Sequence, residues 1–133
     1  MKRSVLDSFA LLSYLQGEPH GEVVRDLLEQ AKAGERQLFC CWVNLTEVYY
    51  TIARRLGNSR AAEVLLLLEE LPLQFLPADR AISLQAAEIK RQFPLALGDA
   101  FAAGAARHLE ADVVTGDPEF RHLADLVQII WLA

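Results

Sequence analysis

The spacing of apolar residues along the chain changes repeatedly, from short uninterrupted runs to stripes with helical periodicity. The short runs, which are typical of buried strands, cover residues 4–6, 37–43, 73–76, 112–115 and 126–131. Stripes with helical spacing predict helices over residues 9–16, 23–33, 44–55, 59–71, 79–93 and 98–109, with a helical turn at 118–122. Strands that alternate with helices favour a parallel sheet covered on both faces, which is a three-layer α/β/α fold.

Residues that favour helix ends set several of these boundaries. Gly17 and Gly34 end the first two helices, and Pro94 breaks the fifth. Asn44 and Ser59 are the predicted N-caps of the third and fourth helices, because their side chains can accept a hydrogen bond from a free backbone N–H.

The fourth predicted helix carries four consecutive leucines at positions 65–68. Such a helix is apolar on too many sides to face solvent. It is expected either deep in the core or in a subunit interface, and from this feature we predict a homodimer.

Composition narrows the functional classes. The 133 residues are 53% apolar and 23% charged, values typical of one folded domain, here expected over 1–133. The net charge of −5 counts against a plain RNA-binding module, since such proteins usually carry a basic surface. An acidic enzyme can still act on RNA when metal ions neutralise its carboxylates.

Location in the cell can also be predicted from the sequence. No apolar run approaches the ~18 residues of a membrane span, and the basic start is followed at once by Asp7, unlike a secretory signal. Cys40 and Cys41 are adjacent, so their side chains on a strand face opposite ways and an intrachain bridge is not expected. A reducing cytoplasm suits these thiols best.

Four acidic residues stand at predicted helix starts, where each has a simple structural explanation. Asp7 and Asp117 are suited to N-capping, the latter with Pro118 as the first helical residue. Glu47, three residues after Asn44, fits a capping box, and Asp99 complements a helix dipole.

The four positions together favour a second interpretation. In a parallel sheet every strand-to-helix junction lies at the carboxyl edge of the strands, so these distant acids are expected to converge. Clustered carboxylates repel unless a cation lies among them. Oxygen ligands without a histidine or cysteine cluster select Mg²⁺ or Mn²⁺ over zinc; His20, His108 and His122 lack the spacing of a metal site.

The chain resembles the PIN domain, and in particular the toxin subunit of VapBC-type toxin–antitoxin pairs. The resemblance rests on four segments in the family's order, at residues 5–12, 44–48, 97–103 and 114–120. It implies a roughly five-stranded parallel sheet and a metal-dependent endoribonuclease that hydrolyses RNA phosphodiester bonds. The implied metal ligands are Asp7, Glu47, Asp99 and Asp117, with Ser8 and Thr115 supporting them.

The resemblance also implies partners, and other functions remain open. A cognate antitoxin is expected to lay an amphipathic segment in a groove beside the site. Arg54 lies seven residues after Glu47, on nearly the same helix face, and is a candidate for contact with RNA. One alternative is a catalytically silent binding subunit with the same fold. Another is an aspartate-nucleophile phosphotransferase or phosphatase, which is disfavoured because Phe9 stands where a second Asp would be needed.

Overall fold

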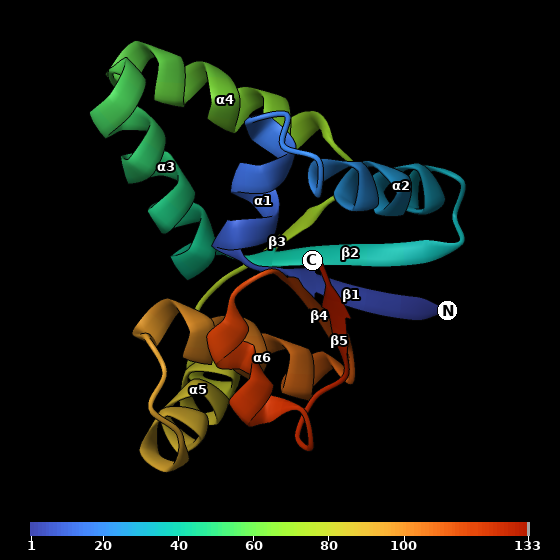
Figure 1. The fold of residues 1–133 in the computed structure, drawn as a ribbon, viewed down its shortest axis with the longest axis vertical. Helices are drawn as coiled ribbons and strands as arrows, with labels where there is room; N and C mark the ends of the chain where they lie inside the picture. Colours follow the sequence, from blue (N-terminus) through green and yellow to red (C-terminus); the bar gives the residue numbers. More distant parts are fainter. Residues whose placement is uncertain (133) are drawn as a thin grey trace.

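The computed structural model describes residues 1–132, and its centre is a five-stranded sheet in which every neighbouring pair is parallel (Figure 1). The strand order is β3-β2-β1-β4-β5. The strands are β1 (Lys2–Leu6), β2 (Arg36–Cys41), β3 (Gln74–Leu76), β4 (Asp112–Thr115) and β5 (Ile129–Trp131). The first strand in sequence is therefore central, and it pairs with β2 on one side and β4 on the other.

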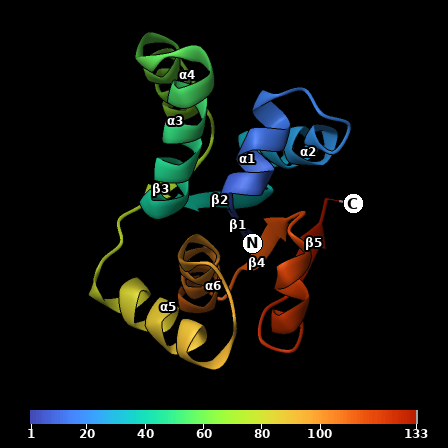
Figure 2. The ribbon, with the colours of Figure 1, turned by 60° about the vertical axis from the view of Figure 1, so that its left-hand side comes forward.

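Helices cover both faces, so the predicted three-layer α/β/α fold is confirmed (Figures 1 and 2). One face carries α1 (Ser8–Leu15), α2 (Gly21–Lys32), α3 (Trp42–Leu56) and α4 (Asn58–Glu70). The other face carries α5 (Arg80–Gln92), α6 (Leu97–Leu109) and the short 3-10 helix η1 (Pro118–Leu123).

Side chains of the central strands point alternately to the two faces of the sheet and so contribute to both halves of the core. Leu6 and Val114 are fully buried under α1 to α4, whereas Val5 and Val113 are fully buried against α5 and α6. Because successive side chains of a strand point to opposite faces, a strand buried on both sides has to be apolar throughout. This explains why the strand runs in the sequence are continuous rather than alternating.

The small residues of the Ala- and Gly-rich helix α6 allow it to pack closely against α5. A Cβ atom added at Gly104 would lie 2.8 Å from the backbone nitrogen of Ala86 and 3.2 Å from the carbonyl oxygen of Ile82. Glycine therefore lets the two helices approach each other more closely than any other residue would.

Several predicted boundaries are wrong, among them the starts of α3, α4 and β5. Helix α3 begins at Trp42 instead of Asn44, and its N-cap Cys41 contributes no side-chain hydrogen bond. Helix α4 begins at Asn58, directly after Gly57, so Ser59 lies inside it. Strand β5 is shorter than predicted because residues 126–128 belong to the turn before it, where the N–H groups of Leu126 and Val127 donate to the carbonyl of Leu123.

Both cysteines are buried free thiols, as their adjacency predicted. Within residues 1–132, no helix has the length and the apolar character that crossing a bilayer requires.

Candidate functional site

The predicted site residues lie at the edge of the sheet that is formed by the carboxyl ends of the central strands. Asp7 follows β1 directly, and Thr115 is the last residue of β4, with Asp117 two positions later. Glu47 lies on α3, the helix that follows β2, and Asp99 lies in the first turn of α6. Four segments that are distant in sequence thus contribute acids to one edge of the sheet.

Asp7 is held rigidly by hydrogen bonds to both carboxylate oxygens. Its Oδ1 accepts from the backbone N–H of Ala10 at 2.9 Å, which makes it the N-cap of α1 as predicted. Its Oδ2 accepts from the hydroxyl of Thr115. The side chain is only 1% exposed, so the capping role and a place in the acidic site are compatible.

Thr115 connects Asp7 to the segment that contains Asp117. While its hydroxyl donates to Asp7, the same oxygen accepts from the backbone N–H of Asp117 at 3.0 Å. Asp117 in turn accepts from the N–H of Glu119 at 2.9 Å and caps η1, with Pro118 in the first turn as predicted.

Glu47 does not belong to a capping box, because α3 begins five residues before it. Its Oε1 instead accepts from the hydroxyl of Ser8 and from the side-chain amide of Asn44, each at 3.4 Å. The contact with Ser8 connects α3 to the start of α1.

Asn44, which the sequence assigned to helix capping, has a different role in the structure. It is fully buried, and its amide nitrogen donates to the carbonyl of Gly98 at 3.1 Å, linking α3 to the start of α6. Its Oδ1 is buried and accepts no hydrogen bond from any residue within 1–132. A buried polar side chain at this edge was not predicted as part of the site, although Asn in an otherwise apolar stripe is the signal that marks it.

Gly98 creates the space that Glu47 occupies. A Cβ atom at this position would lie 2.1 Å from Oε1 of Glu47. Any larger residue would push the carboxylate away from its present place.

The tightest group of acids includes a residue that sequence reasoning missed. Carboxylate oxygens of Asp99, Asp117 and Glu119 lie within 4.8 Å of one another. Glu119 is exposed and belongs to η1, two residues after Asp117. The nearby Asp117 was the only signal in the sequence that could have indicated Glu119. The sequence does not show that a 3-10 turn brings these two carboxylates together. Asp7 and Glu47 are outside this triplet.

The carboxylates nevertheless influence one another electrostatically. Burial raises the pKa of Asp7 to about 7, although hydrogen bonds from Thr115 and Ala10 lower it, and the charges of Asp117 and Glu47 raise it further. Burial also raises the pKa of Asp99 to about 7, and the charges of Asp117, Asp7 and Glu47 add to this effect. Asp7 and Asp99 thus each lie within electrostatic reach of the other predicted acids.

This donor set fits a hard divalent cation. It consists of carboxylate oxygens, and the acidic triplet contains no histidine or cysteine, which suits Mg²⁺ or Mn²⁺ rather than zinc. A bound cation would offset both the burial and the neighbouring charges that raise these two pKa values.

Arg54 is exposed on α3, and its guanidinium lies 5.0 Å from the centre of the Tyr50 ring. This cation–π contact orders the side chain, and contact with RNA stays a prediction. The three histidines are exposed, as expected of residues outside a metal site.

Several solved structures with the same fold are toxins or toxin–antitoxin complexes, and they are distant in sequence. DNA-bound VapBC from Salmonella typhimurium matches with a TM-score of 0.79 and 18% identity, covering 100% of both chains. FitAcB from Neisseria gonorrhoeae matches with a TM-score of 0.71 and 20% identity, covering 97% of each chain. VapC20 from Mycobacterium tuberculosis, described as a sarcin–ricin loop cleaving toxin, matches with a TM-score of 0.67 and 16% identity over 91% of this chain and 94% of that one.

Sequence comparison assigns the family directly. None of the curated proteins matches this chain. The family model of the PIN domain, however, matches residues 4–126, a stretch that contains most of β1, all of β2, β3 and β4, and every acid described above. The chain therefore belongs to the PIN domain family.

Proposed function

We propose that this PIN-domain chain is a divalent-metal-dependent endoribonuclease and the toxin of a type II toxin–antitoxin pair, with residues 1–133 forming a single domain. The observation that carries the proposal is the Asp99–Asp117–Glu119 triplet, with Asp7 and Glu47 in electrostatic reach. Burial is the largest cause of the raised pKa values of Asp7 and Asp99, and a purely structural protein gains nothing from adding neighbouring acids whose charges raise them further.

Asp7, Glu47, Asp99 and Asp117 are the proposed ligands of Mg²⁺ or Mn²⁺, and Glu119 is an additional candidate. When bound, the ion supplies Lewis acidity that activates water and neutralises charge on the scissile phosphate. Thr115 is a positioning residue for Asp7, because its hydroxyl fixes one of the two carboxylate oxygens. Ser8 and Asn44 position Glu47 in the same way.

The proposed activity is tested by incubating the purified protein with mixed RNA and Mg²⁺ or Mn²⁺. We expect cleavage that EDTA abolishes and that Asp99→Asn reduces by more than about 100-fold, since metal ligands contribute more than the groups around them. Asp26→Asn, at an exposed acid on α2, is the matched control and should cleave normally. Circular dichroism establishes that both variants are folded.

Binding of the metal is measured separately, by titrating Mn²⁺ into the protein without RNA. Binding that is lost in Asp99→Asn and kept in Asp26→Asn supports the ligand assignment even if the RNA chosen is a poor substrate. Saturable metal binding with no cleavage of any RNA would favour the silent binding subunit. Cleavage that Asp99→Asn leaves unchanged would contradict the proposed site.

A groove between α1, α3 and α4 supports the proposed antitoxin partner. Its volume is about 410 Å³, and its wall contains mainly apolar side chains, among them Leu12, Leu15, Ile52, Val64 and Leu67. Arg55 and Arg60 border it. An amphipathic segment with acidic residues flanking its apolar side chains has the matching chemistry.

The exposed side of α4 supports a homodimer. Val64 and Leu68 are buried in the core, but Leu66 is 63% exposed and Leu67 54% exposed. We further propose that the protein works in the cytoplasm, where the buried free thiols of Cys40 and Cys41 would stay reduced.

A further inference from the structure

Within residues 1–132 four aromatic side chains are exposed, and two of them border the segment 115–117 of the acidic site. Phe9 is 38% exposed and Trp131 is 39% exposed. The other two, Trp42 and Tyr50, belong to α3. Single apolar side chains on a surface are ordinary, but two exposed rings beside one acidic segment indicate a binding surface.

The ring of Phe9 packs against Gly116, which stands between Thr115 and Asp117. A Cβ atom added at Gly116 would lie 2.7 Å from Cζ and 2.9 Å from Cδ1 of this ring. The φ angle of Gly116 is outside the left-handed region, so its backbone conformation does not require glycine. Glycine at this position therefore provides the room that the ring needs next to Asp117.

Trp131 borders the same segment from the neighbouring strand. It is the last residue of β5, and its Cα pairs with that of Thr115 in the parallel register. In-register neighbours point to the same face of a sheet, so the two side chains share one face. Because the hydroxyl of Thr115 donates to Asp7, an exposed indole stands one strand away from the group that positions this acid.

The third acidic segment also carries an exposed apolar side chain. Leu97 is 58% exposed and lies two positions before Asp99, in the first turn of α6. Apolar groups thus accompany the acids in all three segments, although the acids themselves require a polar ligand.

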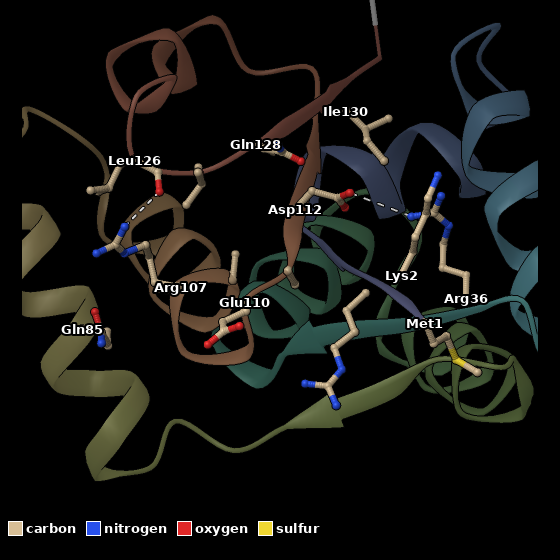
Figure 3. Close-up of a pocket in the computed structure, with 14 residues that line it drawn as sticks. Met1, Lys2, Arg36, Gln85, Arg107, Glu110, Asp112, Leu126, Gln128 and Ile130 are labelled. Carbon is tan, nitrogen blue, oxygen red and sulfur yellow. Dashed lines mark hydrogen bonds and ion pairs between the residues drawn. The ribbon is translucent and has the colours of Figure 1, made fainter.

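The opposite edge of the sheet is built differently. A cavity of about 770 Å³ lies there, where the amino ends of β1 and β4 meet the end of α6 (Figure 3). None of the described residues that line it is aromatic. Two of its arginines are engaged within the protein: Arg36 lies 3.9 Å from Oδ2 of Asp112, and Arg107 donates to the carbonyl of Leu126 at 3.0 Å. The pair of exposed rings is therefore a feature of the acidic edge.

Stacking on aromatic rings suits an acidic protein that has to hold RNA. The chain has 18 acidic residues against 13 Lys and Arg, so it attracts phosphates less strongly than a basic RNA-binding protein does. A base that stacks on an aromatic ring contributes affinity that does not depend on net charge. Since a phosphodiester has a nucleoside on each side, rings beside the acids adjoin the bases of any RNA bound there.

We propose that Phe9 and Trp131 position the substrate, each by stacking on a base next to the phosphodiester that is cleaved. The inference rests on the proposed nuclease function, and it assigns contacts with RNA to two residues that bind no metal. Stacking is made before the transition state is reached, so its loss should raise KM more than it lowers kcat. Bases differ in stacking strength, so the rings also favour certain nucleotides beside the cleavage position.

Trp131 itself reports on stacking, because a base stacked on an indole quenches its fluorescence. Trp42→Phe leaves Trp131 as the only tryptophan of the chain. This variant is titrated with a short RNA oligomer of mixed sequence in Ca²⁺, which carboxylate oxygens also bind. We expect saturable quenching by RNA and none by an abasic oligomer of the same length. Trp131→Phe, which retains only Trp42, is the control and should show no quenching.

Phe9 is tested by binding in the Trp42→Phe background and by cleavage. Phe9→Leu keeps an apolar side chain but removes the ring, so RNA affinity should fall and KM rise about fivefold or more, with kcat changed less than about twofold. Phe9→Tyr retains the ring and should stay close to the wild type. Tyr14→Leu removes a ring near the other end of α1 and should change neither quantity. Mn²⁺ affinity should be equal in all these variants, because no proposed ligand is altered.

The outcomes separate stacking from the proposed nuclease function. Cleavage of RNA without quenching of Trp131, or with equal KM for Phe9→Leu and the wild type, would overturn the stacking inference and leave the nuclease proposal intact. Equal quenching of Trp42 and Trp131 would also overturn it, since contact would not be specific to the ring beside Thr115. Quenching by RNA but not by the abasic oligomer, in a chain that cleaves no RNA, would support stacking and contradict nuclease activity.

Discussion

The hydroxyl of Thr115, at the end of β4, donates a hydrogen bond to Oδ2 of Asp7, at the end of β1, across 108 positions of sequence. Thr115→Val keeps the shape of the side chain and removes this donor together with the acceptor for the N–H of Asp117. We expect a loss of about 1–3 kcal/mol in the free energy of unfolding, because buried groups lose their partners. Mn²⁺ affinity should fall as well, since Asp7 is no longer oriented.

Thr115→Ser is the matched control for that experiment, because it retains the hydroxyl. The free energy of unfolding, measured by urea denaturation, and the Mn²⁺ affinity should both be close to the wild-type values in this variant. If the Val and Ser variants lose affinity equally, the hydroxyl has no part in positioning Asp7.

Gly98→Ala is expected to impair the metal site while sparing the fold. The new methyl group would displace the carboxylate of Glu47, which is flexible, so the free energy of unfolding should change by less than about 1 kcal/mol. Mn²⁺ affinity should fall by about tenfold or more. Gly104→Ala should give the opposite result, because its methyl group would meet the backbone of α5: stability falls by about 1–3 kcal/mol and the folded protein binds Mn²⁺ normally.

The raised pKa values of Asp7 and Asp99 predict how the stability of the metal-free protein depends on pH. Both carboxyls have a pKa of about 7 in the folded protein and of 3.8 as the reference value, so folding favours their neutral forms. Their contribution to stability is therefore fully present below pH 3.8 and is lost as the pH rises towards and through 7.

In Asp99→Asn one of these groups no longer ionises. In EDTA, the variant should gain stability relative to the wild type between pH 5 and pH 8, by at least about 1 kcal/mol at the upper end. Saturating Mg²⁺ should reduce or reverse the difference, since the ion stabilises the charged form. A constant difference between the two proteins across this range would show that Asp99 does not titrate there.

Glu119→Gln tests the acid that only the three-dimensional structure revealed. If Glu119 belongs to the metal site, Mn²⁺ affinity should fall by about three- to tenfold, less than for the buried Asp99→Asn, because an exposed carboxylate is better solvated. Glu110→Gln, at the opposite edge of the sheet, is the control of equal charge. Equal affinities of both variants and the wild type would remove Glu119 from the proposed ligands.

The proposed homodimer is tested at α4. Leu66→Glu together with Leu67→Glu adds charge to an exposed apolar surface and should convert a dimer into a monomer in light scattering at micromolar concentration. Leu84→Glu, at an exposed leucine on α5, should leave the mass unchanged. A wild-type protein that is already monomeric at this concentration would contradict the proposal.

The sequence predicted the order of elements well because strand runs buried on both faces and helical stripes differ clearly in period. It also predicted which edge carries the acids, since Asp7 follows β1 directly and Asp117 comes two residues after β4. It failed at Asn44, because capping propensity outweighed the tertiary contact with Gly98, which no local pattern reveals. Glu119 was missed for a similar reason: its position depends on the 3-10 turn and on the approach of α6.

The central position of β1 has a consequence for synthesis of the chain. The first strand to leave the ribosome has to wait for β4, encoded more than one hundred residues later, before its second neighbour arrives. Asp7 and Glu47 emerge early, but the segment with Asp117 and Glu119 follows β4 and is made much later. A partly made polypeptide therefore lacks the complete set of acids until nearly all of the chain has been translated and folded.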